Sequence, residues 1–254
     1  MTDPTKRFSN RVDNYVKYRP GNPREVVEVL ARECGLTSDS TVVDVGSGTG
    51  ILTELFLENG NRVIAVEPNR EMREAAERLL AARPGFESVD GTAEATTLPN
   101  AVADLVAAGQ AFHWFDQART REEFARILKP GAYVALVWNV RDVEANDFMR
   151  EYEGLLREYG TDYEAVSHHG VALSEMEGFF GEGRYELRTL RNSQVLDYEG
   201  LRGRLLSSSY VPAPGESNFE PMLAALGDLF KTRSDGGSVE IVYATKVFFG
   251  RLRE

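Results

Sequence analysis

The chain has 254 residues, of which 42% are hydrophobic and 27% charged, and its formal net charge is −11. This length and composition predict one large globular α/β domain with a full hydrophobic core. The acidic balance argues against a nucleic-acid partner, which needs a basic face. Cys34 is the one cysteine, so an internal disulfide framework is excluded, and we expect a buried thiol. Neither a signal-peptide pattern nor a long apolar run is visible, so we expect a cytoplasmic protein without a membrane partner.

The chain opens with two predicted helices. Tyr15, Val16 and Arg19 have helical spacing within the segment 8–23, and the proline after Arg19 ends that helix. Apolar residues with the same spacing predict an amphipathic helix over 24–34, and a glycine follows it. The first helix either packs peripherally on the core or covers a site.

A β-branched run at Thr41–Val45 then predicts a buried parallel strand. It breaks into Gly46, Gly48 and Gly50, and an amphipathic helix over 51–57 follows at once. Glycines let the backbone turn tightly and approach a ligand, and the helix start leaves free N–H groups. In open α/β sheets this position, at the carboxyl end of a parallel strand, is where ligands bind.

Two kinds of ligand are possible at this turn, a dinucleotide and a cation. A dinucleotide site would have G-x-G-x-x-G, but Ile51 stands where the third glycine belongs. Asp44 lies two residues before the first glycine, and its carboxylate would repel a pyrophosphate but suit a cation. A glycine-rich turn without any ligand is the third possibility.

The stretch 44–50 resembles motif I of the class I S-adenosylmethionine (AdoMet)-dependent methyltransferases, an acid followed after one residue by G-x-G-x-G. The resemblance implies a Rossmann-like, seven-stranded, doubly wound α/β sheet with an antiparallel last strand and a small helical cap. It also implies that AdoMet, a cation joined to a nucleoside, is bound by Asp44, Gly46, Ser47, Gly48 and Gly50.

The next two strand ends extend this resemblance. The predicted strand 62–66 ends at Glu67 and Pro68, which match motif II, and a carboxylate there can accept from both ribose hydroxyls. A short strand over 86–90 precedes a loop in which Ala93 and Glu94 match the adenine-binding position of the family. Taken alone, each of these could be an ordinary surface loop.

The fourth predicted strand, 103–108, leads into Gly109, Gln110 and the run Ala-Phe-His-Trp-Phe-Asp at 111–116. Aromatic faces can hold an adenine, a sulfonium or an apolar acceptor. The run is similar to one in small-molecule methyltransferases of the group that contains trans-aconitate and quinone-precursor methyltransferases. Gly109 and Gln110 are therefore expected at the cofactor.

The remaining elements are predicted from hydrophobic pattern and turn signals. They are helices over 70–82, 120–128, 145–159, 198–209 and 218–233, and strands over 133–138, 185–196 and 238–249. The paired His168 and His169 have no ligand set at metal spacing, so we expect no metal site.

In the family, a lead-in like 8–23 forms a lid, which implies that Tyr15, Tyr18 or Arg19 lines the site. The segment 198–233 would be a cap inserted into one methyltransferase domain spanning 1–254, with 207–210 as candidate pocket residues. We expect a small-molecule acceptor, bordered by Trp114 and Trp138, and a monomer or homodimer.

Methyl transfer is an in-line displacement that needs alignment more than a base. His113 could act as a base if the acceptor requires one, or could simply stack in the aromatic cluster. Two rival functions stay open, an NAD(P)-dependent oxidoreductase and a non-catalytic AdoMet-binding protein.

Overall fold

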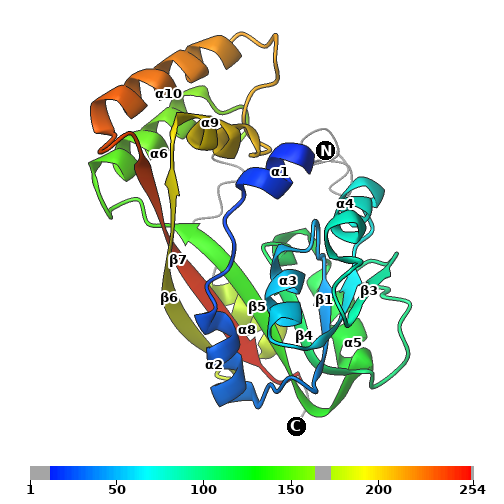
Figure 1. Ribbon diagram of the computed structural model, residues 1–254. Helices are drawn as coiled ribbons and strands as arrows, with labels where there is room; N and C mark the ends of the chain where they lie inside the picture. Colours follow the sequence, from blue (N-terminus) through cyan, green and yellow to red (C-terminus); the bar gives the residue numbers. More distant parts are fainter. Residues whose placement is uncertain (1–11, 164–172, 253–254) are drawn as a thin grey trace.

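The computed structural model describes residues 12–163 and 173–252 of the chain (Figure 1). One seven-stranded sheet runs through the molecule in the order β3-β2-β1-β4-β5-β7-β6. Strands β1 to β5 are parallel, and β7 is antiparallel to both β5 and β6. The predicted fold class is therefore confirmed. The strands are β1 (Thr41–Val45), β2 (Arg62–Val66), β3 (Phe86–Val89), β4 (Ala103–Gly109), β5 (Leu128–Arg141), β6 (Tyr185–Leu196) and β7 (Val239–Gly250).

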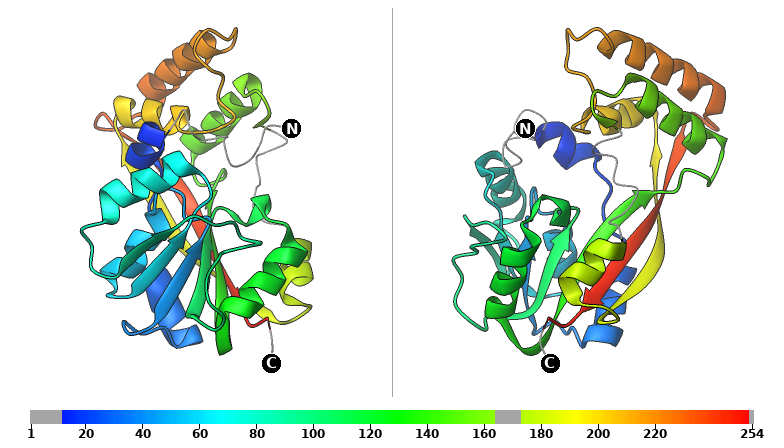
Figure 2. Two further views of the ribbon diagram at one scale, coloured as in Figure 1. Left: turned by 90° about the vertical axis from the view of Figure 1, so that its right-hand side faces the viewer. Right: turned by 180° about the vertical axis from the view of Figure 1, so that it is seen from behind.

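Helices cover both faces of the sheet (Figure 2). They are α1 (Val12–Tyr18), α2 (Glu25–Cys34), α3 (Ile51–Glu58), α4 (Arg70–Leu80), η2 (Phe112–Trp114), α5 (Gln117–Ile127), α6 (Asp147–Tyr159), α8 (Leu173–Phe180), α9 (Tyr198–Leu206) and α10 (Phe219–Arg233). Successive residues of a strand point to opposite faces. Thus Val42 packs with α2 and α3, while Val43 packs with α5 and α8. None of the described helices is long and apolar enough to cross a membrane.

The parallel register brings the expected ligand-binding strand ends to one edge. In β1, Asp44 is paired with Ala65 of β2 and with Ala107 of β4. The turn after β1, the residues after β2 and the end of β4 therefore lie side by side. This edge is the topological switch point of the sheet, because β1 pairs with β2 on one side and with β4 on the other.

A helical cap stands beyond the carboxyl ends of the parallel strands (Figure 1). The β6–β7 pairing continues to Leu196↔Val239, whereas the β5–β7 pairing stops at Arg141↔Tyr243. The hairpin thus projects past β5 and carries α9 and α10. Helix α6, which follows β5, packs with them in one apolar cluster that includes Leu156, Leu201 and Leu226.

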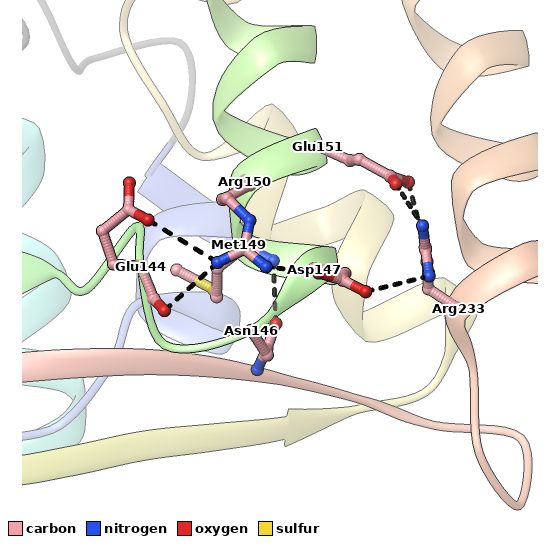
Figure 3. Close-up of polar contacts among 7 residues, drawn as sticks. All are labelled: Glu144, Asn146, Asp147, Met149, Arg150, Glu151 and Arg233. Atoms are coloured by element: carbon pink, nitrogen blue, oxygen red, sulfur yellow. Dashed lines mark hydrogen bonds and ion pairs between the residues drawn. The ribbon is translucent and has the colours of Figure 1, made fainter.

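Ion pairs on the outer surface also join α6 to α10 (Figure 3). Arg233 of α10 contacts Glu151, and it lies 3.5 Å from Asp147. Arg150 contacts Asp147 and lies 3.6 Å from Glu144. These side chains are exposed enough for each pair to contribute at most about 1 kcal/mol. The apolar cluster therefore provides most of the adhesion of the cap.

Several boundaries differ from those predicted. Strand β5 begins at Leu128, and its pairing with β4 jumps from Ala103↔Leu128 to Leu105↔Tyr133. The strand therefore begins with a bulge, five residues before the predicted start at 133 and at the last residue of the helix predicted over 120–128. Helix α8 was not predicted, although it buries Met176 and Phe179. Cys34 is half-buried at the edge of the α2 cluster rather than fully enclosed.

Candidate active site

A cavity of about 330 Å³ opens at the switch-point edge of the sheet, between the strand ends, α1 and the cap. A smaller cavity of about 50 Å³ adjoins it over the glycine turn. The volume of the larger one falls in the range usual for small-molecule sites. Residues from distant parts of the chain meet there: Tyr15, Arg19, Gly46, Glu67, Glu94, Gln110, His113, Trp138, Arg141, Arg204, Tyr210 and Tyr243.

Gly46, Gly48 and Gly50 have different structural roles in the turn. All three have positive φ, between +58° and +88°. A Cβ on Gly46 would lie 2.7 Å from Ala111, and one on Gly50 would lie 2.5 Å from Leu80. The close packing at both positions therefore leaves no room for a side chain. Gly48 has open space where a Cβ would stand, and it lines both cavities. Gly50 lines neither, so its placement supports the start of α3 and not a ligand contact.

Asp44 is fully buried beneath this turn. Its Oδ2 accepts a 2.6 Å hydrogen bond from the Thr53 hydroxyl, while Oδ1 has no partner among the described residues. Burial, with a smaller contribution from the Glu67 carboxylate, raises the pKa of Asp44 to about 7 against that hydrogen bond. Asp44 and Ser47 line the smaller cavity. An unpaired, buried carboxyl oxygen at this position fits a cationic ligand group.

Glu67 spans the gap between the ends of β1 and β2. Its Oε2 accepts from the Gly48 N–H at 2.9 Å, and its Oε1 accepts from the Asn69 N–H at 2.8 Å. Burial raises the pKa of Glu67, although these two hydrogen bonds oppose the shift. Each carboxylate oxygen keeps a second lone pair for a hydroxyl donor. Pro68 lines the cavity beside it.

The loop after β3 closes the far end of the cavity. Thr92 and Ala95 form an isolated bridge, and Ala93 between them is buried in the core while still lining the cavity. The Glu94 Oε1 accepts from the Asp116 N–H at 2.9 Å, which ties this loop to the start of α5. Ala93 and Glu94 thus lie where a flat ring could rest against the loop.

The end of β4 carries local backbone strain. Gln110 has φ of +57°, an uncommon value for a residue with a side chain. Its Nε2 donates to the Asn139 carbonyl oxygen of β5 at 3.0 Å, which fixes the side chain across two strand ends. Gly109 and Gln110 line both cavities. Strain of this kind is concentrated at functional sites.

The aromatic run after β4 divides between core and cavity. Phe112 is fully buried and packs edge-on against Phe179 at 4.7 Å between ring centroids. His113 and Trp114 line the cavity, with their ring centroids 4.5 Å apart, and Trp138 from β5 lies 6.3 Å from His113. His113 therefore lines the cavity and also contacts the aromatic cluster, with its ring tilted by 46° to that of Trp114.

Helix α1 covers the opening. Tyr15 and Arg19 line both cavities, and the Arg19 guanidinium lies 4.7 Å from the Tyr15 ring centroid. The Arg19 Nη2 donates to the Ser207 carbonyl oxygen of the cap at 2.9 Å. Tyr18, by contrast, is not among the residues that line the cavities, and its ring lies over Gly203 of α9, where an added Cβ would come within 2.1 Å.

Sequence reasoning missed several lining residues, among them Met72, Arg204 and Tyr243, and did not assign a role to Arg141 at the strand end. The helical pattern held one usable signal, because Arg204 follows Leu201 at i+3 and so falls on the apolar face of α9. His168 and His169 lie outside the described residues. Within 12–163 and 173–252, no group of His, Cys, Asp and Glu is placed to hold a metal ion.

Comparisons with known proteins agree on one family. Residues 43–136 match the methyltransferase domain family model. An uncharacterized methyltransferase of Mycobacterium tuberculosis is 39% identical over 140 residues, which span 55% of each chain, so the match covers about half the length of this relative. An uncharacterized methyltransferase-like protein of Schizosaccharomyces pombe is 27% identical, and the match covers 96% of this chain and 94% of that one.

Solved structures show the same fold. A candidate type II methyltransferase from Anaeromyxobacter dehalogenans superposes with a TM-score of 0.68 at 24% identity, over 93% of this chain and 99% of the other. A SAM-dependent methyltransferase from Aquifex aeolicus has a TM-score of 0.51 at 17% identity, over 78% and 93%. The matched region contains the glycine turn, Glu67 and the aromatic run. Residues 43–136 therefore match a methyltransferase domain, and the chain as a whole has the fold of the methyltransferases to which it is similar.

Proposed function

We propose that this protein transfers a methyl group from AdoMet to a small-molecule acceptor. The observation that carries the proposal is the unpaired Oδ1 of the fully buried Asp44, which lines a cavity under a glycine turn. Such an oxygen suits the positively charged amino-acid end of AdoMet and repels the phosphates of a dinucleotide. The net charge of −11 supports a small molecule rather than a nucleic acid as acceptor.

The neighbouring residues suit the other parts of the cofactor. Glu67 would hold the ribose hydroxyls, and Ala93 and Glu94 would border the adenine. Arg19 lines both cavities, so its guanidinium is available to the methionine carboxylate. When bound, the sulfonium supplies a methyl group already activated by the positive sulfur, so no metal is required.

The chain's own contribution is alignment and exclusion of water. Holding donor and acceptor in line can supply roughly 7–11 kcal/mol of the barrier. Helix α1 and the cap close the cavity on the acceptor side, and the Arg19–Ser207 hydrogen bond joins them. His113 lies on this side and is the candidate proton acceptor for substrates that must lose a proton. Its tilted ring contact with Trp114 also supports one wall of the pocket.

The test is formation of S-adenosylhomocysteine (AdoHcy) with panels of small acids, alcohols, amines and thiols. We expect acceptor-dependent product with the wild-type protein and a large loss in Asp44→Asn, with Asp39→Asn as a control because Asp39 is an exposed carboxylate that lines neither cavity. Binding of AdoMet without turnover on any panel would favour a non-catalytic AdoMet-binding protein. A pH–rate profile of His113→Gln decides whether the imidazole takes a proton.

A further inference from the structure

Two arginines lie on the acceptor side of the larger cavity and do not border the smaller one, which has Asp44 in its wall. Arg141 comes from the end of β5, and Arg204 comes from α9 of the cap. Arg204 is 4% exposed, and the Arg141 side chain is 15% exposed. Both guanidinium groups are therefore largely removed from water, and each needs compensating partners.

The partners present do not balance these charges. Arg204 donates from Nε to the Tyr243 hydroxyl at 3.1 Å and from Nη1 to Ser208 Oγ at 3.1 Å, and both acceptors are neutral. Among the described residues no carboxylate lies within ion-pair distance of Arg204. Arg141 has one, Glu153, at 3.5 Å.

That single carboxylate is itself shared. Glu153 also accepts from the Tyr163 hydroxyl at 2.6 Å and lies 3.5 Å from Arg157. The Arg141 Nε is buried without a hydrogen-bond partner in the part of the chain that the structure describes. The acceptor side of the cavity thus holds more positive than negative charge. It also has a free hydrogen-bond donor, the Arg141 Nε, for which the described residues provide no acceptor.

Tyr210 responds to this positive field. The Arg141 Nη1 donates to its hydroxyl oxygen at 3.1 Å. Burial opposes ionisation of the phenol, yet the charges of Arg141, Arg204 and Arg19 together lower the pKa of Tyr210 to about 8. The neighbouring Arg19 also experiences the excess of positive charge. Burial is the main cause that lowers the pKa of Arg19, and the charge of Arg204 lowers it as well.

The cavity is therefore bipolar, acidic at Asp44 and Glu67 and basic at Arg141 and Arg204. We propose that the methyl acceptor is a small organic anion whose carboxylate or phosphate group pairs with Arg204 and Arg141. This inference rests on the proposed methyltransferase function. The arginine fork matches either anion in a bidentate way, and the two sources are separated by the experiment. An uncharged acceptor would leave the excess positive charge of Arg141 and Arg204 unbalanced, and a cationic one would be repelled.

The test is direct binding to the AdoHcy-loaded protein, measured by calorimetry with three anions, succinate, benzoate and phenyl phosphate. Each is compared with its uncharged counterpart, succinamide, benzamide or phenol. We expect at least one anion to bind, with at least tenfold preference over its neutral counterpart. Arg204→Met should weaken that binding tenfold or more, and Arg204→Lys should restore part of it. Preference for phenyl phosphate over the carboxylates would assign a phosphate, and the reverse would assign a carboxylate.

Arg121→Met is the matched control, because Arg121 is a partly buried arginine whose side chain donates to the carbonyl oxygens of Phe179 and Leu252 and lines neither cavity. It should leave anion binding unchanged. Far-ultraviolet circular dichroism checks that each variant is folded. Equal binding of anions and neutral counterparts, no binding of any anion, or unchanged affinity in a folded Arg204→Met would each overturn the proposal.

A second readout does not depend on turnover. The tyrosinate absorbance of wild type minus that of Tyr210→Phe reports the ionisation of Tyr210. An anion bound beside it should raise its pKa from about 8 toward the ordinary value, and Arg204→Met should raise it without any ligand. The inference would be contradicted if the pKa of Tyr210 rose neither on binding of an anion nor in Arg204→Met. If AdoMet and AdoHcy fail to bind, the proposed function falls, while this titration on the unliganded protein still decides the charge of the pocket.

Discussion

Replacing Asp44 by asparagine should move stability and cofactor affinity in opposite directions. The amide keeps the shape of the side chain and an oxygen that can accept from the Thr53 hydroxyl, which is 2.6 Å away in the present structure. It removes a carboxyl group that is fully buried and has one oxygen unpaired. The native protein therefore holds a carboxyl group whose ionisation is disfavoured by burial.

The size of the stability change follows from the pKa of Asp44. Burial raises the pKa of Asp44 from 3.8 to about 7. Because the folded state binds the proton more tightly than the unfolded chain, stability falls as pH rises between about 4 and 7 and is constant above. The shift corresponds to an upper bound of about 4 kcal/mol at pH 8. Asp44→Asn should thus be more stable than wild type at pH 8 by a part of this amount, and equally stable near pH 4.

The affinity for the cofactor should change in the opposite direction to the stability. A cation beside Asp44 favours the carboxylate, so AdoMet affinity of the wild type should rise with pH up to about 7 and then level off. In Asp44→Asn we expect affinity to be more than tenfold weaker at pH 8, or about 1.4 kcal/mol, and the pH dependence to disappear. Urea unfolding and isothermal titration at pH 4.5, 6 and 8 measure both effects. A variant that is no more stable at pH 8 and binds AdoMet as well as wild type would refute the reasoning, and Asp39→Asn at an exposed site should change neither quantity.

The remaining predictions concern other parts of the fold. Glu67→Ala should weaken AdoMet binding more than tenfold in calorimetry, because it removes the acceptor expected for the ribose hydroxyls; unchanged affinity would contradict that role. Gly203→Ala should displace the lid helix and raise KM, since its Cβ would come within 2.1 Å of a tyrosine ring, whereas Gly154→Ala, with open space around its Cβ, should be neutral or slightly stabilising. Leu226→Ala, fully buried in the cap, should cost about 2–5 kcal/mol in urea unfolding, but Arg233→Ala on the cap surface less than about 1 kcal/mol. Equal losses for that last pair would mean that ion pairs, not apolar packing, hold the cap.

The sheet could be predicted from sequence because its central strands are buried on both faces. Thr41–Val45 and Arg62–Val66 have the bounds predicted for them, since apolar composition and tertiary burial agree over most of both strands. Helix α8 escaped prediction because it is short and its segment also holds polar residues. Strand β5 begins earlier than its apolar run, because the bulge beside Ala103 extends its pairing.

The candidate site divides in the same way. Its cofactor half comes from consecutive strand ends, so the spacing of Asp44, the glycines and Glu67 could be read from one short stretch. Its acceptor half comes from elements far apart in the chain, as the Arg204–Tyr243 hydrogen bond shows. Only the packing of the cap onto β7 brings these residues together. Tyr18 was expected at the site for its place in the lid segment, but the close approach of α1 to Gly203 directs its ring to the cap.

The central claim is that the cavity at the switch point is built for a cationic nucleoside. Isothermal titration of the wild-type protein with AdoMet, AdoHcy and NADH at pH 8 tests it most directly. We expect AdoMet and AdoHcy to bind at one site and NADH to give no heat of binding. Binding of NADH without binding of AdoMet would contradict the claim and indicate a dinucleotide-dependent enzyme on the same sheet.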